Sequence, residues 1–459
     1  MREFTLDGLR GLKAIEPEFE ITSDGSRLDV IVGPTLATSL KMPLRDNPDR
    51  WADVTVAVIE AGRAYSDRLN KASAERLFEA VYDAAIAALD TFSRYDTASQ
   101  APETRAVREG FVGIGISVRM QSDFALVVLV HENTPSARGG LKAKDRITHV
   151  DGDPVEGWSQ QQLVQALRGQ ANTRVHLTID RPGDPQAIEV DLTRAWYVPQ
   201  TVRVDRRGRV AVVRISSFNQ DTGRTLARSI AKLRRHRAEL DGIVLDLRDN
   251  PGGLLDQAVE VADAFLADGE IVATQGRHPH SMQRFSASGA DLASGLPVVV
   301  LVNGNSASAS EVVAAALQDR GRAVVIGTNS YGKGTVQTVY RLPNDGELTL
   351  TWSRLYAPSG YRLQDLGVLP TVCSHTGSSL GATDLIATIR DSKAPTRQKL
   401  REWRTVDGAD DTALAALRDV CPAGTDNGDT DMEIAEALMG DPSAYADAVE
   451  VADPIVAHR

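Results

Sequence analysis

The chain has 459 residues, a formal net charge of −11 and a hydrophobic fraction of 42%. This length predicts roughly two to four domains, and the apolar fraction is that of a folded protein with a sizeable core. The acidic balance, without a basic stripe interleaved with aromatic residues, argues against nucleic-acid binding. No apolar stretch approaches a membrane span, and residues 1–12 lack the basic and apolar segments of an export signal. We therefore expect either a cytoplasmic protein or a chain from which a leader has been removed.

Cysteine and histidine usage predicts neither a metal site nor a cofactor. Cys373 and Cys421 are the two cysteines, neither has a histidine at a metal-ligand spacing, and the eight histidines do not cluster. The two cysteines form either one disulfide between the core and the tail or two unrelated thiols. Spacing alone does not decide between these alternatives.

Residues 1–109 begin irregularly and then become helical, which predicts a mainly helical N-terminal region. Apolar residues at helical spacing predict helices over Val54–Leu69 and Ser73–Leu89.

The pattern changes to short strands and turns over residues 110–198. Gly113, Ile114, Gly115 and Ile116 form a glycine-containing turn before an expected strand at Ala125–Val130. Further expected elements are a strand at Ile147–Gly152, a helix at Ser159–Arg168 and a strand at Arg174–Asp180.

Strands and helices alternate over residues 199–375, which predicts βαβ units with parallel strands. The expected strands are Val210–Ser216, Asp241–Leu247, Val298–Val302, Ala323–Gly327 and Glu347–Leu355, and the expected helices are Thr222–Arg235 and one starting at Glu311. Functional sites form in the loops at the carboxyl ends of such strands.

A hydroxyl nucleophile beside an amine base is the chemistry that this third region favours. Ser308 lies in a small-residue turn between an apolar strand and a helix, where first-turn N–H groups can stabilise an oxyanion. Lys333 follows 25 residues later, flanked by glycines. A lysine has an ordinary pKa of about 10.4, so it acts as a base at neutral pH only where burial lowers that value. Ser306 and Ser310 are the alternative nucleophiles, and we expect them to serve the turn or the helix cap.

Together with Gln337, these residues resemble the active-site signature of the carboxyl-terminal processing peptidases, or tail-specific proteases. The resemblance implies that Ser308 is the nucleophile, that Lys333 is the base and that Gln337 positions the lysine. It also implies an oxyanion hole made by the N–H groups of Gly253, in an Asn-Pro-Gly-Gly turn, and Ala309. Each such donor typically stabilises a transition state by about 3–4 kcal/mol.

Residues 110–198 resemble a PDZ domain of the bacterial protease type. The resemblance implies that Gly113, Ile114, Gly115 and Ile116 form the loop that binds a peptide's terminal carboxylate. The sequence departs from the family where Lys144 and Asn172 replace turn glycines, and asparagine tolerates a positive φ better than lysine does.

The resemblance implies a multidomain α/β protein with a crotonase-like ββα protease core at 199–375, a PDZ domain and helical terminal regions. We therefore expect an ATP-independent serine endopeptidase that cleaves proteins with apolar carboxyl termini outside the cytoplasmic membrane. The sequence decides neither whether the protein forms a homo-oligomer nor whether it needs an activating partner. Trp352 and Tyr361 are bulkier than the family pattern, and either shape a specificity pocket or fill the core. The alternative functions are an inactive PDZ adaptor and a crotonase-type acyl-coenzyme A enzyme.

Residues 376–459 form an acidic C-terminal region. From Asp407 onward Arg418 and Arg459 are the only Lys or Arg residues, although helices are predicted over Thr412–Val420 and Glu433–Met439. This charge bias favours a solvated, loosely ordered extension, with docking or dimerisation as the alternative.

Overall fold

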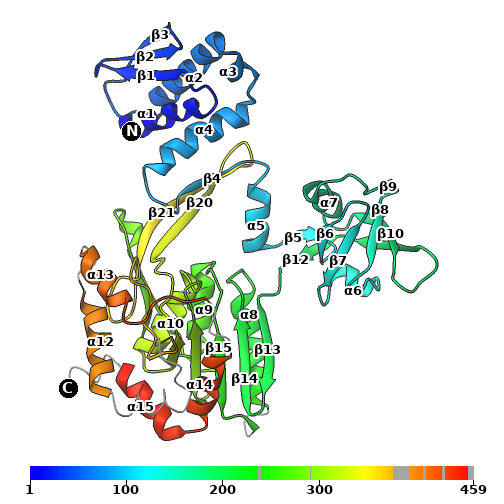
Figure 1. Cartoon of the computed structure of the whole chain (residues 1–459), viewed down its shortest axis with the longest axis vertical. Coiled ribbons are helices and arrows are strands. Elements are labelled where there is room, and N and C mark those ends of the chain that lie inside the picture. Colours follow the sequence, from blue (N-terminus) through cyan, green and yellow to red (C-terminus); the bar gives the residue numbers. More distant parts are fainter. Residues whose placement is uncertain (236–238, 290, 376–392, 407–409, 426–428, 453–459) are drawn as a thin grey trace. The chain divides into compact units, whose positions relative to one another are not determined.

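The computed structural model describes residues 1–235, 239–289, 291–375, 393–406, 410–425 and 429–452 (Figure 1). The chain divides into two compact units. Unit 1 comprises residues 1–104, 276–281 and 335–353, and unit 2 comprises residues 105–275, 282–334 and 354–459. Residues 376–392 and Arg459 of the expected C-terminal region lie outside the described residues. Every helix in the described part is too short or too polar to cross a membrane.

Unit 1 contains a three-stranded antiparallel sheet as well as helices, so the prediction of a mainly helical N-terminal region is incomplete. After α1 (Arg2–Arg10), the strands β1 (Phe19–Ser23), β2 (Arg27–Val32) and β3 (Thr35–Lys41) pair in the order β1-β2-β3. The strands are short, and the turn between the first two is an Asp-Gly turn in which Gly25 has φ 97°. Such a turn is a hairpin signal that helical periodicity does not detect.

The helices of unit 1 follow this sheet. They are α2 (Pro48–Tyr65), α3 (Asp67–Lys71) and α4 (Ala74–Ala87). The helix predicted over Val54–Leu69 is interrupted at Ser66, whose hydroxyl accepts the N–H of Leu69 at 3.2 Å and so starts α3. Within unit 1, β4 (Arg94–Asp96) pairs with β21 (Glu347–Tyr356), which also neighbours β20 (Thr335–Arg341).

The PDZ-like region of unit 2 begins after α5 (Ala101–Glu109) and is built around a sheet of order β11-β10-β8-β7-β6. Its elements are β5 (Phe111–Gly113), β6 (Ile116–Met120), β7 (Ala125–Val130), α6 (Pro135–Arg138), β8 (Arg146–Val150), β9 (Asp153–Pro154), α7 (Gln160–Leu167), β10 (Arg174–Asp180), β11 (Ile188–Thr193) and β12 (Ala195–Tyr197). The strands predicted at Ala125–Val130 and Arg174–Asp180 are confirmed. The expected positive φ is present at both departures from the family pattern, 77° at Lys144 and 68° at Asn172.

The second part of unit 2 is a six-stranded sheet of order β13-β14-β15-β18-β19-β22. Its strands are β13 (Val202–Arg207), β14 (Val210–Ile215), β15 (Gly242–Asp246), β18 (Val298–Val302), β19 (Val324–Gly327) and β22 (Val372–Cys373). All pairs from β14 to β22 are parallel, as the alternation of strands and helices predicted, while β13 is an antiparallel edge strand. The helices α8 (Thr222–Arg234), α9 (Leu255–Asp263) and α10 (Ala309–Asp319) connect this sheet, and β16 (Glu270–Gln275) and β17 (Gln283–Ser286) pair with each other.

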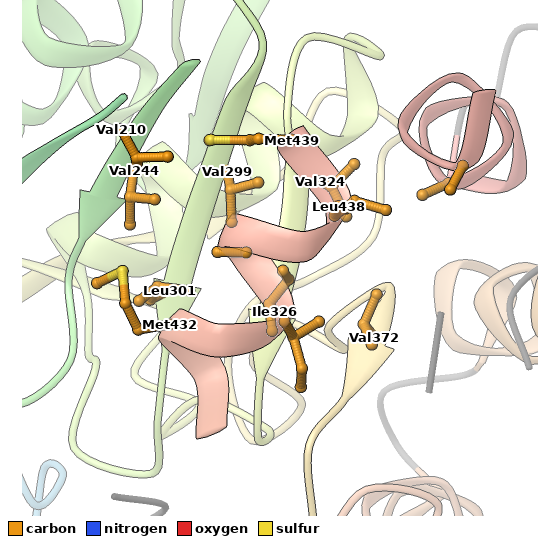
Figure 2. Close-up of a cluster of buried hydrophobic side chains, with 14 residues drawn as sticks. Val210, Val244, Val299, Leu301, Val324, Ile326, Val372, Met432, Leu438 and Met439 are labelled. Carbon is orange, nitrogen blue, oxygen red and sulfur yellow. The ribbon is translucent and has the colours of Figure 1, made fainter. Parts of the chain in front are cut away.

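The described part of the C-terminal region packs on this sheet, so the expectation of a loosely ordered extension is wrong there. It contains α12 (Lys393–Thr405), α13 (Asp411–Arg418), α14 (Thr430–Met439) and α15 (Pro442–Ala452). Figure 2 shows Met432, Leu438 and Met439 against side chains of the central strands, and all three are at most 4% exposed. Burying each such side chain stabilises the packed state by about 1.5–3 kcal/mol. The packing of this region is thus decided by its apolar residues at helical spacing and not by its excess of acidic side chains.

Cys373 of β22 and Cys421, which follows α13, form a disulfide. Of the two alternatives left open by the sequence, the bridge between core and tail is therefore the one observed. The disulfide attaches the C-terminal region to the edge strand of the sheet.

Candidate active site

Three loops of unit 2 emerge at one edge of the parallel sheet. They comprise residues 247–253 after β15, 303–308 after β18 and 328–334 after β19. Because β15, β18 and β19 are adjacent and parallel, their carboxyl ends meet at this edge. The first two loops bind each other in both directions, since Asp249 N–H donates to Asn303 Oδ1 at 3.0 Å and Asn303 Nδ2 donates to Asp249 Oδ1 at 2.9 Å.

Ser308 occupies a strained position at the start of α10. Its φ of 57° and ψ of −112° fall in a region that residues other than glycine rarely adopt, and its N–H donates to Glu311 Oε2 at 2.6 Å. Gly252 packs directly against it, because a Cβ on Gly252 would lie 2.9 Å from the Cβ of Ser308. Strain of this kind is concentrated at functional sites.

The two alternative serines are committed to the backbone, as expected. Ser306 Oγ donates to Leu247 O at 2.8 Å, and Ser310 Oγ donates to Asn250 O at 2.9 Å. Both side chains are fully buried, whereas Ser308 is half-buried.

Gly253 and Ala309 lie on adjoining backbone segments. Bonds from Phe218 N–H to Gly252 O and from Leu254 N–H to Phe218 O, both 2.9 Å long, fix the chain on either side of Gly253. Ala309 is the first residue of α10, where the N–H has no partner within the helix. A Cβ on Gly252 would lie 3.1 Å from Ala309 N. The arrangement can therefore offer backbone donors beside Ser308.

Glu311 is the residue of this site that sequence reasoning missed. Its carboxylate is fully buried and accepts from the segments of both Ser308 and Lys333: Oε2 accepts the N–H groups of Ser308 at 2.6 Å and Lys333 at 2.9 Å. Oε1 accepts Gly332 N–H and Ser330 Oγ, both at 2.6 Å. Burial raises the pKa of Glu311, while these four donors act in the opposite direction. The available signal was the Ser-x-x-Glu spacing of a capping box.

Lys333 is half-buried and lies between two glycines that pack closely against their surroundings. A Cβ on Gly334 would lie 1.9 Å from Gln364 N, and Gly332 has φ 92°. Tyr331 N–H donates to Ser306 O at 3.0 Å, which links this loop directly to the serine loop. The structure thus brings the segments of Ser308, Lys333, Gly253 and Ala309 to one edge of the sheet.

Gln337 belongs to β20 in unit 1. Its Nε2 donates to Thr335 Oγ1 at 2.8 Å and to Thr351 Oγ1 at 3.3 Å. Trp352, also in unit 1, packs against His278 with ring centroids 5.4 Å apart and the ring planes tilted by 35°. Tyr361 of unit 2 fills the core, because it is only 5% exposed and its burial raises its pKa well above the ordinary value.

A groove of about 270 Å³ lies between β6 and α7 in the PDZ-like region. The predicted loop residues Gly113, Ile114, Gly115 and Ile116 all line it. Arg168 at the end of α7 adds a cation, with its guanidinium 4.6 Å from the centre of the Phe111 ring. The side chain of Gln160 bonds to the strand edge, donating to Val118 O at 3.1 Å and accepting Met120 N–H at 2.8 Å.

Comparison with known proteins gives the family. Residues 209–374 match the model of Peptidase family S41, and residues 112–192 match that of the PDZ domain. The chain is 40% identical over 301 residues to the "Carboxy-terminal-processing protease" of Bartonella bacilliformis, covering 65% of this chain and 69% of that protein. The chain belongs to peptidase family S41. This S41 chain is also 34% identical over 318 residues to a "Probable CtpA-like serine protease" of Staphylococcus aureus, covering 68% of this chain and 62% of that protein.

A similar solved structure is titled "Photosystem II D1 C-terminal processing protease". It shares 27% identity with the S41 chain at a TM-score of 0.39, covering 70% of this chain and 90% of that one. The relatives and family matches confirm the resemblance seen in the sequence, the mixed α/β fold with a PDZ domain, and membership in a group of serine peptidases that process carboxyl termini.

Proposed function

We propose that this S41 chain is a serine endopeptidase that cleaves peptide bonds through an acyl-enzyme, with Ser308 as nucleophile and Lys333 as base. The observation that carries the proposal is the buried carboxylate of Glu311, which binds the backbone N–H groups of both residues. A nucleophile and its base need a fixed mutual geometry, and a shared acceptor supplies it.

The reaction uses the residues as follows. Lys333, neutral at rest, takes the proton of Ser308 as Oγ attacks the scissile carbonyl, and Gln337 holds the lysine. The N–H groups of Gly253 and Ala309 stabilise the oxyanion, each by about 3–4 kcal/mol. Lys333 then gives the proton to the leaving amine, and water hydrolyses the acyl-enzyme.

The substrates in this proposal are proteins with apolar carboxyl termini. The terminal carboxylate binds the N–H groups of the loop at Gly113–Ile116, near the positive charge of Arg168, and the tail adds as a strand beside β6. Val164 and Leu167 of α7 offer apolar side chains to the tail. The order of events is recognition of the tail followed by cleavage of a nearby bond.

We place this activity outside the cytoplasm. The support is the disulfide between Cys373 and Cys421, because such bonds persist in oxidising compartments and are rare in the cytosol.

The test is cleavage of an unfolded protein with an apolar carboxyl terminus by the native chain, Ser308→Ala and Lys333→Ala across pH. The native chain is expected to cut at a rate that rises with pH, while both variants are silent. Lys399→Ala, on the exposed face of α12, controls for the loss of a lysine and should remain active. Amidating the substrate's carboxyl terminus should raise KM through the PDZ groove.

Activity that survives Ser308→Ala would show that the nucleophile is wrong. A native chain that binds several such tails but cuts none of them would identify an adaptor instead.

A further inference from the structure

Residues 418–425, which comprise the last residue of α13 and the segment after it, lie against the loops that carry Ser308 and Lys333, and we call them the tail brace. Gly424 O accepts Gly304 N–H at 2.8 Å in residues 303–308, the serine loop. The same oxygen accepts Thr328 Oγ1 at 3.1 Å in residues 328–334, the lysine loop. Asn329 Nδ2 donates to Arg418 O at 2.8 Å. Thr328 and Asn329 are fully buried, so the tail brace supplies partners for groups that water does not reach.

Arg418 joins the tail brace to the lysine loop through its guanidinium. Its Nη2 donates to Ser330 O at 3.1 Å and its Nη1 donates to Leu366 O at 2.6 Å. The hydroxyl of Ser330 donates to Glu311, so Glu311 and Arg418 hold the same residue through its side chain and its backbone carbonyl. A hydrogen bond from a charged donor is roughly twice as strong as a neutral one.

The disulfide fixes the tail brace to β22, which pairs with β19, the strand that precedes the lysine loop. Cys421, a member of the brace, is fully buried and bonded to Cys373, which lies opposite Gly327 at the end of β19. Residues 328–332 begin immediately after that strand. The disulfide and the hydrogen bonds of Arg418 and Gly424 thus fix the tail brace beside residues 328–330.

We propose that Arg418 is a positioning residue, through which the C-terminal region holds the backbone ahead of Lys333 in its active geometry. The inference rests on the proposed role of Lys333 as base. It assigns a role to one of the two Lys or Arg residues in the otherwise acidic part of the chain after Asp407.

Removing the guanidinium leaves two backbone carbonyls, those of Ser330 and Leu366, without a strong donor. The lysine loop then relaxes and the amine of Lys333 becomes better hydrated, so that it ionises more readily. A displacement of about 1 Å at a reacting group can cost about 100-fold in rate. Arg418→Ala should therefore lower kcat by about 10- to 100-fold, leave KM unchanged and move the pH midpoint of kcat upward.

The experiment measures kcat, KM and the pH profile of the full chain for Arg418→Ala and Arg418→Lys, at a temperature well below each variant's melting point. Arg207→Ala is the matched control, because Arg207 also joins the tail, through Asp429 and Glu436 at 3.2 Å each, but on β13. Lysine reaches one carbonyl, so Arg418→Lys should give an intermediate kcat, and Arg207→Ala should be native.

If Arg418→Ala does not fold, Arg418→Lys decides the question by the same pH midpoint. Native kcat and an unshifted midpoint in the folded Arg418 variants overturn the inference, as does an equal loss in Arg207→Ala. A failure of the proposed function is distinguishable, because it appears as activity in Ser308→Ala.

Discussion

Glu311 allows a sharp test of how the site is held together. In Glu311→Gln, the amide nitrogen must replace one of two oxygens that each accept two donors. Placed at Oε2, it would face the buried N–H groups of Ser308 and Lys333. Placed at Oε1, it would face Gly332 N–H and the hydroxyl of Ser330, which can reverse and accept. The second orientation costs less and preserves the hydrogen bonds from Ser308 and Lys333.

The magnitude follows from the number of donors left without a partner. Glu311→Gln leaves one buried N–H unpaired, which costs about 1–3 kcal/mol of folding free energy. The neutral amide also avoids the free-energy cost of burying a charged carboxylate. This cost is the reason that burial raises the pKa of Glu311. Glu311→Ala leaves three N–H groups and one hydroxyl unpaired, and should cost on the order of 4–5 kcal/mol.

The assay is urea unfolding of the full chain together with kcat for tail cleavage. We expect Glu311→Gln to keep measurable activity and Glu311→Ala to lose about 100-fold or more, since only alanine frees the segments of both Ser308 and Lys333. Glu433→Gln, an exposed carboxylate at the start of α14, is the control and should change stability by less than about 0.5 kcal/mol. Equal stability and activity of the glutamine and alanine variants would refute the reasoning.

Three further predictions concern backbone and charge. Gly252→Ala should abolish cleavage, because its Cβ would lie 2.9 Å from the Cβ of Ser308. Gly183→Ala is the control, because Gly183 has a φ of 95°, close to the 100° of Gly252, but its Cβ would have no atom within 4 Å. It should leave kcat native, and an equal loss of kcat in both alanine variants would contradict the prediction. Lys144→Gly should stabilise the PDZ domain by about 0.5–1 kcal/mol by relieving a φ of 77°, seen as slower amide hydrogen exchange. Lys142→Gly, outside that turn position, should not stabilise it. Burial raises the pKa of Asp145, but bonds from Arg181 and Lys142 N–H outweigh it and the pKa lies below its ordinary value. This stabilisation is present above pH about 3.9 and is lost as pH falls through the lower folded pKa. The stability gap between the native chain and Asp145→Asn should therefore narrow on acidification, and a constant gap would argue against the ion pair.

The sequence predicted the core sheet and the Ser308 and Lys333 loops because both signals are local. Apolar runs such as Val298–Val302 mark buried strands, and glycine-rich turns directly after them mark the loops. Glu311 and Arg418 were not predicted because their roles depend on segments that meet only after folding. In the sequence, Glu311 is an ordinary residue of a helix start and Arg418 an isolated cation.

The errors at the two ends have separate causes. Charge counting over the acidic region concealed the apolar spacing of Met432, Leu438 and Met439, which decides the packing of α14. At the N-terminus, three short strands gave too little alternation to compete with the strong helical periodicity that follows. Pairing of the cysteines needed the distance between their backbones, which spacing does not contain.

Tyr445 of α15 bonds to a strand that is synthesised much earlier than α15 itself. Its hydroxyl donates to Val298 O at 3.0 Å and accepts Val298 N–H at 2.9 Å, at the start of the strand that leads to Ser308. The two residues are 147 positions apart. At roughly 5–20 residues per second, a ribosome needs roughly 7–30 s to travel that distance. During this interval the apolar side chains of β18 and β19 lack the cover that α14 and α15 give them in the folded protein.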